Sequence, residues 1–99
     1  MPLLEISVTP VGTDSTSFSS DVTNAVRKIE EKGLKYQLTP TATVVEGDID
    51  QLWEVARDMH QEAISSEVQR VITNISIDHR TDKQMDMNHQ VDTVRQSLE

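Results

Sequence analysis

Residues 34–47, LKYQLTPTATVVEG, decide the fold of this chain of 99 residues. The segment is too short for a helix and two strands, but it is long enough for two strands, which we predict at residues 35–39 and 41–46. Pro40 separates them because proline cannot donate a hydrogen bond to a sheet ladder. The second half is also rich in β-branched residues, which favour strand over helix.

A strand and a helix flank this segment on each side. Residues 3–11 alternate between apolar and polar side chains, the two-residue period of a strand, and residues 68–79 do the same. Residues 18–32 and a segment starting at Asp48 instead carry apolar residues at helical spacing. The helical residues are Phe18, Val22, Ala25, Val26 and Ile29 in the first, and Ile49, Leu52, Trp53, Ala56, Met59 and Ala63 in the second.

The order of these elements is β-α-β-β-α-β within a single domain over residues 1–99. Both helices can then cover one face of a four-stranded antiparallel sheet, the split β-α-β arrangement of the α+β class. Ser17 or Ser19 is expected to cap the first helix, and Gly33 to end it in a left-handed conformation. Gln51 occupies the capping-box position after Asp48, and the second helix should fray near Ser65 and Ser66.

A further helix is predicted at the C-terminus, with a narrow apolar stripe of Met87, Val91, Val94 and Leu98. The covered face of the sheet already holds two helices, so this stripe must pack at the sheet edge or on another protomer. We favour the second alternative and expect a homo-oligomer, a dimer or a tetramer. In the preceding connector, Asp82 is expected to cap the helix. Alternatively, Arg80 and Lys83 meet acidic groups of a neighbouring subunit or a ligand anion.

The second face of the sheet carries polar side chains. Core-facing candidates are Leu4, Ile6, Val8, Tyr36, Leu38, Val71, Ile75 and Ile77. The opposite face would carry Glu5, Ser7, Thr9, Asn74, Ser76 and Asp78. Some of Gln37, Thr39, Thr41 and Thr43 should join them; which ones stays open, because a bulge at Pro40 would invert the alternation of side chains beyond it. This face is either solvated or a surface that binds a small polar heterocycle when a second subunit excludes water.

Composition argues against several classes of function. The formal net charge is −8 and only three residues are aromatic, which disfavours nucleic acid and anionic membranes as partners. The absence of cysteine removes disulfides, thiolate catalysis and cysteine metal sites. The three histidines form no pair at helical metal spacing and the three glycines no phosphate loop. We therefore predict no enzyme, no metal and no cofactor, and, with no signal sequence or transmembrane run, a cytoplasmic location.

Three segments resemble one known family. They are LEISVTPVGT at residues 4–13, LTPTATVVEG at residues 38–47 and RTDK at residues 80–83. Together they resemble the small thiamine-binding proteins of the YkoF-like superfamily, with Ala42 where that family usually has glycine. The resemblance implies a ferredoxin-like fold with an extra C-terminal helix, dimers packed through their sheets and often paired into tetramers, and non-catalytic binding of thiamine or its hydroxymethylpyrimidine moiety.

The resemblance also suggests binding residues. Ser7 and Thr9 match the first motif, and Thr41, Thr43 and Glu46 match the central one. An aminopyrimidine offers N–H donors and ring-nitrogen acceptors, which suit carboxylates and hydroxyls. Asp78 and Glu5 are added because a negative surface suits the cationic thiazolium of thiamine. The ligand is expected on the polar sheet face near a subunit interface. The alternative is a structural or regulatory homo-oligomer whose polar face binds a protein or no ligand.

Overall fold

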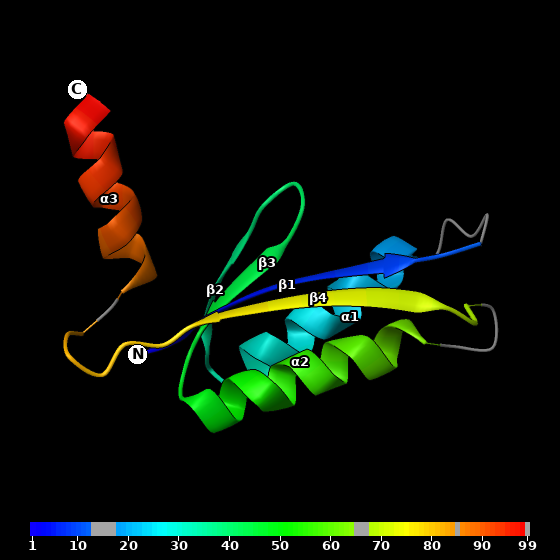
Figure 1. Cartoon of the computed structure of the whole chain (residues 1–99). Coiled ribbons are helices and arrows are strands. Elements are labelled where there is room, and N and C mark those ends of the chain that lie inside the picture. The colour runs from blue at the N-terminus through cyan, green and yellow to red at the C-terminus, as the bar shows by residue number, and fades with distance from the viewer. Residues whose placement is uncertain (13–17, 65–67, 85, 99) are drawn as a thin grey trace.

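The computed structural model describes residues 1–12, 18–64, 68–84 and 86–98, without the side chains of residues 18–22 (Figure 1). Its elements follow the predicted order, and the α+β class with a four-stranded antiparallel sheet and an extra helix is confirmed. They are β1 (Leu3–Pro10), α1 (Phe18–Glu31), β2 (Lys35–Leu38), β3 (Thr43–Glu46), α2 (Ile49–Ala63), β4 (Val71–Asp78) and α3 (Met87–Leu98).

The sheet has the strand order β2-β3-β1-β4, and α1 and α2 lie together on one of its faces (Figure 1). The hydrophobic core fills the space between this covered face and the two helices. Its side chains with at most 7% exposure are Leu4, Ile6, Ala25, Ile29, Val45, Leu52, Val55, Ala56 and Met59. We call the other side of the sheet the open face.

The ends of the helices follow from local sequence. Gly33 has a φ of +72°, a left-handed value that glycine adopts without strain. The N–H of Asp48 donates to Oε1 of Gln51 at 3.1 Å, as expected for a capping box. The candidate cap Ser17 and the fraying residues Ser65 and Ser66 lie outside the described residues. So do the side chains of Phe18, Ser19 and Val22.

The register resolves the phase across Pro40. Thr43 lies opposite both Ile6 and Leu38, so its side chain belongs to the covered face, where it is 5% exposed. The prediction that allowed Thr43 on the open face is therefore wrong. The physical reason is a tight turn: the N–H of Thr39 donates to the carbonyl oxygen of Ala42 at 2.9 Å, and β3 starts only at Thr43, not at Thr41.

Three apolar residues are less buried than the sequence suggests. Leu38 and Ile75 point to the covered face by register, but both lie on edge strands and remain 59% and 43% exposed. Trp53 does not belong to the buried stripe of α2, because its side chain is 53% exposed, whereas Val55 is buried and was not predicted. In α2, therefore, the position of a residue in the helical repeat predicts its burial better than its hydrophobicity does.

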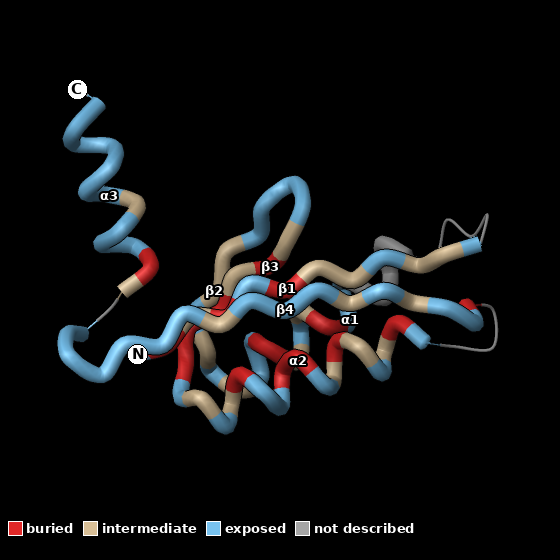
Figure 2. Tube along the Cα trace, in the orientation of Figure 1, coloured by how far each residue is buried: buried red, intermediate tan, exposed pale blue. Residues whose placement is uncertain are grey.

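The helix α3 projects away from the sheet and from α1 and α2 (Figures 1 and 2). Only its first turn is held, with Met87 5% exposed, while Val94 and Leu98 are 59% and 81% exposed. The alternative in which the apolar stripe of this helix packs along the edge of the sheet is therefore wrong. None of the described helices combines the length and hydropathy needed to cross a membrane.

Candidate functional site

Three carboxylates surround Leu3 on the open face. Leu3 of β1 lies opposite Glu46 of β3 on one side and opposite Asp78 of β4 on the other. Directly opposed residues point to the same side of a sheet, and neighbouring strands are about 5 Å apart, so the backbones of Glu46 and Asp78 lie about 10 Å from each other on either side of Leu3. Glu5, two residues further along β1, points to the same face.

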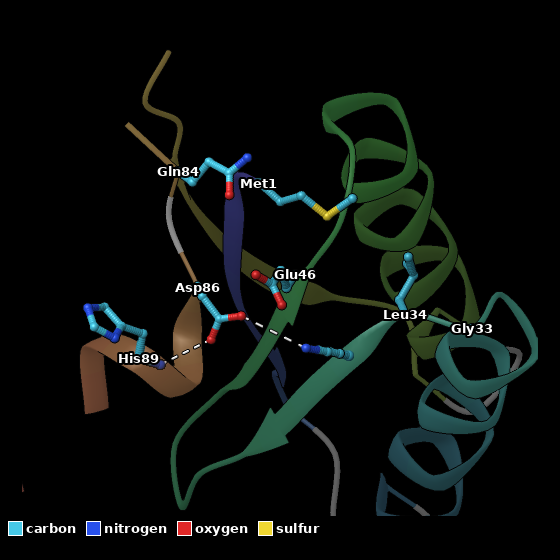
Figure 3. A pocket seen from close by; sticks show the side chains of 8 residues that line it. Met1, Gly33, Leu34, Glu46, Gln84, Asp86 and His89 are labelled. Atoms are coloured by element: carbon cyan, nitrogen blue, oxygen red, sulfur yellow. Dashed lines mark hydrogen bonds and ion pairs between the residues drawn. The ribbon is translucent and has the colours of Figure 1, made fainter. Parts of the chain in front are cut away.

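A cavity of about 580 Å³ lies where the open face meets the base of α3 (Figure 3). Lys35 and Glu46, which are opposite each other on β2 and β3, form its sheet side. The α3 side is formed by Asp86 and His89. The described lining residues are Met1, Gly33, Leu34, Lys35, Glu46, Gln84, Asp86 and His89. This volume lies within the range of small-molecule sites, roughly 300–1,000 Å³. We refer to it as the Glu46 cavity.

Glu46 is the chemically distinctive residue of this cavity. It is 7% exposed, and its side chain makes no hydrogen bond or ion pair with any residue that the structure describes. Figure 3 shows its carboxylate directed into the cavity. The carboxylate oxygens are not among the fully buried atoms, so they remain accessible from the cavity to a donor brought by a ligand. This arrangement suits a ligand that carries an amine or a positive charge.

The base of α3 is held by Asp86. Its Oδ1 accepts a hydrogen bond from the backbone N–H of His89 at 3.0 Å, and Lys35 Nζ lies 3.9 Å from its Oδ2. The His89 hydrogen bond, aided by the charge of Lys35, holds the pKa of Asp86 below its ordinary value. Gln37 also donates to Asn88 at 3.4 Å. These contacts place the first turn of α3 beside β2.

The cap predicted at Asp82 is therefore wrong, because Asp86 takes that position. Asp82 instead accepts two hydrogen bonds from Arg80, at 3.0 Å from Nε and 2.7 Å from Nη2. This pairing lowers the pKa of Asp82 and occupies the guanidinium of Arg80. Neither Arg80 nor Lys83 is among the described residues that line the Glu46 cavity.

Two smaller hollows hold most of the other predicted binding residues. One, of about 210 Å³, lies on the open face between the carboxylates of Glu5 and Asp78, with Ser76 beside them and Leu3, Leu4 and Val44 as apolar lining. The other, of about 240 Å³, lies at the β2–β3 turn and is lined by Ser7, Thr41 and Thr43 together with apolar residues that include Met59.

The structure thus divides the six residues predicted to bind ligand. Glu46 lines the large cavity, Asp78 the open-face hollow, and Ser7, Thr41 and Thr43 the hollow at the turn, while Thr9 lines none of these three. Sequence reasoning missed Lys35, Asp86 and His89. The spacing of Asp86 and His89, typical of a helix cap and its N3 residue, was the signal that could have identified Asp86.

Comparisons with known proteins agree on one family. The family model described as thiamine-binding protein matches residues 4–95. The UPF0045 protein in the glkA 3′ region of Staphylococcus xylosus is 39% identical over 99% of this chain and 95% of its own length. The UPF0045 protein YqgV of Bacillus subtilis is 32% identical over 100% and 99%.

Solved structures share the fold. The hypothetical protein MJ1052 of Methanocaldococcus jannaschii superposes with a TM-score of 0.78 at 26% identity, covering 94% of each chain. A Thermotoga maritima protein, whose description connects it with thiamine biosynthesis or salvage, superposes with a TM-score of 0.68 at 24% identity. That match covers 94% of this chain and 97% of the other.

Proposed function

The chain belongs to the thiamine-binding protein family, and we propose that it binds thiamine or its hydroxymethylpyrimidine moiety without catalysing a reaction. The observation that carries the proposal is Glu46: the residue is 7% exposed, its carboxylate opens on a cavity of small-molecule size, and it has no partner among the described residues. We place the protein in the cytoplasm, with no metal or cofactor required for binding.

The chemistry of an aminopyrimidine fits this cavity. Its amino group donates to Glu46 in a charge-assisted hydrogen bond, and the apolar side chains of Met1 and Leu34 offer surface for the ring. The thiazolium of thiamine is cationic and gains from the second carboxylate, that of Asp86. Glu5 and Asp78 extend the negative charge over the adjacent open face. Ligand binding, without a catalytic step, is sufficient to explain the presence of these polar residues.

Isothermal titration calorimetry with thiamine, and separately with hydroxymethylpyrimidine, tests the proposal. We expect saturable binding of both compounds and a rise in the thermal unfolding midpoint, because a ligand that binds only the folded state stabilises it. Absence of heat together with an unchanged unfolding midpoint at millimolar ligand would contradict it.

A structural or regulatory homo-oligomer is the second candidate, favoured by the exposed apolar stripe of α3. Val94 and Leu98 leave most of their surface in solvent, and a second protomer would bury it. A dimer or tetramer would also cover the open face and exclude water from it. This assembly is compatible with ligand binding and does not depend on it.

The assembly predicts a position-specific effect on α3. Val94→Asp is expected to lower the sedimenting mass, because it places a charge in the apolar stripe. Gln96→Asp adds the same side chain on the opposite side of the helix, about 160° away at 100° per residue, and should leave the mass unchanged. Equal masses for both variants and for the unchanged chain would contradict a role of α3 in assembly.

A further inference from the structure

The strand β4 forms one edge of the sheet, and among the residues that the structure describes it pairs only with β1 (Figure 1). We propose that its outer side pairs with β4 of a second copy of the chain, antiparallel and related by a two-fold axis, so that the two four-stranded sheets become continuous. This interface is separate from a contact through α3, leaves both open faces on the same side, and does not require a ligand.

The edge at β4 lacks the features by which proteins protect an edge strand from pairing. Such strands are usually short, or carry a bulge, a proline or a lysine. β4 spans eight residues, pairs with β1 without interruption, and contains neither proline nor lysine. The opposite edge strand, β2, has four residues and carries Lys35. Of the two edges, that of β4 is therefore the one suited to receive another strand.

The pairing with β1 identifies the backbone groups of β4 that point outwards. The N–H of Val11 donates to the carbonyl oxygen of Arg70 at 2.9 Å, and this pair continues the register of the two strands. In an antiparallel ladder, residues bonded to the neighbouring strand alternate with residues that are not. Even-numbered residues of β4 therefore bond to β1. The residues whose N–H and C=O groups point outwards are Val71, Thr73, Ile75 and Ile77.

Apolar side chains on both faces of this edge are accessible. Ile75 lies on the covered face but is 43% exposed, so α2 leaves this part of the edge uncovered, and Ile72 on the open face is 45% exposed. A second strand would remove part of both side chains from water, which favours association. It would also supply partners for the outward backbone groups.

The outward groups limit how two copies of β4 can be aligned. A hydrogen-bonded ladder needs outward groups on both strands, so odd-numbered residues must lie opposite odd-numbered residues. A two-fold axis at Asn74 achieves this with all four outward residues inside β4. It places Val71 opposite Ile77 and Thr73 opposite Ile75. Moving the axis by one residue in either direction leaves an outward residue opposite a residue beyond the ends of β4.

The charges at the two ends of the edge favour the same alignment. With the axis at Asn74, Arg70 of one copy lies opposite Asp78 of the other, and symmetry repeats the pair at the other end of the interface. Both residues are exposed, and neither forms an ion pair with another described residue. With the axis at Ile75, Arg70 would lie opposite Arg80, and like charges so placed are destabilising. The edge is therefore complementary to itself in hydrogen bonding and in charge.

Hydrogen exchange at single amides tests the pairing, with sedimentation to measure association. In the associated protein we expect the amides of Thr73 and Ile75 to exchange at least about tenfold more slowly than in the dissociated chain. Asn74 and Ser76, bonded to β1, should be protected in both and serve as the internal control. Fast exchange of Thr73 and Ile75 in the associated protein, as in an assembly held only by α3, would overturn the proposal. So would a single chain at every concentration up to millimolar.

A proline at each edge provides a matched pair of variants. Ile75→Pro removes an outward N–H without removing a bond to β1 and should lower the sedimenting mass. Leu38→Pro makes the same change on β2, where the N–H of the next residue, Thr39, donates to Ala42 and that of Leu38 points outwards. It should leave the mass unchanged. Equal masses for the two folded variants would overturn the proposal.

Exchanging the charges tests the alignment through exposed residues, which the fold tolerates. Arg70→Glu sets two acidic side chains opposite each other at both ends of the interface and should raise the dissociation constant of the two copies by about tenfold. Adding Asp78→Arg restores opposite charges and should recover most of the affinity. A double variant that associates no better than Arg70→Glu alone would overturn the proposed pairing.

Discussion

Replacing Leu52 with alanine is expected to lower the free energy of unfolding by about 2–5 kcal/mol, the range typical of buried leucines. Leu52 is fully buried on the face of α2 that packs against the sheet, within the cluster that contains Leu4, Ile6 and Val45. Truncation removes its apolar contacts and leaves a cavity that the surrounding side chains can refill only in part. A domain of this size has roughly 5–15 kcal/mol of stability, so the effect is large.

The neighbouring residue supplies the matched control. Trp53 is 53% exposed on the outer side of the same helix, so Trp53→Ala should cost about 1 kcal/mol or less despite the larger truncation. Urea unfolding of both variants at one protein concentration measures the difference. A greater loss for Trp53→Ala than for Leu52→Ala would mean that the packing of α2 differs from the one described, or that Trp53 is buried in an assembly.

Replacing Glu46 with glutamine is expected to weaken the binding of thiamine and of hydroxymethylpyrimidine by about 10–100-fold. A hydrogen bond to a charged group contributes about 1.5–3 kcal/mol, and each 1.4 kcal/mol changes the dissociation constant tenfold. Glutamine keeps the shape of the side chain but removes its negative charge. Titration calorimetry on the variant and the unchanged chain measures the loss.

The fold should survive this substitution. The Glu46 side chain makes no hydrogen bond or ion pair with the described residues, so Glu46→Gln breaks none of the contacts described and should leave the unfolding midpoint nearly unchanged. Glu5→Gln is the control, since it makes the same change on the open face outside the described lining of the Glu46 cavity. Loss of affinity in Glu5→Gln with none in Glu46→Gln would place the ligand in the open-face hollow instead.

Part of the candidate site was accessible from sequence. The central motif, residues 38–47, identified Glu46, and the alternation in β1 and β4 identified Glu5 and Asp78, as polar groups of one sheet. Their grouping around Leu3 was not predicted, because it depends on the register between three strands that are far apart in the chain. The contribution of Asp86 and His89 depends on where α3 begins and on its contact with β2.

Thr43 shows, in one residue, why the sequence did not determine which face of the sheet the side chains of β3 point to. From the sequence, Thr43 could point to either face of the sheet, since the alternation of side chains before and after Pro40 is compatible with both. The turn hydrogen bonds between Thr39 and Ala42 select one, and the pairing with Ile6 then buries Thr43 under the helices. A single turn geometry thus decides on which side of the sheet a whole strand presents its side chains.

By itself, the sequence determined the order of strands and helices, the covered face of the sheet and the presence of a third helix. These follow from periods of two and 3.6 residues, which act between neighbours along the chain. Only the tertiary structure decided the strand register, the burial of Glu46 and the projection of α3 away from the sheet. These features depend on contacts between segments that are far apart in the chain, and no local sequence pattern encodes the geometry of such contacts. Because of them, residues 34–47 form not only two strands but also one wall of the Glu46 cavity.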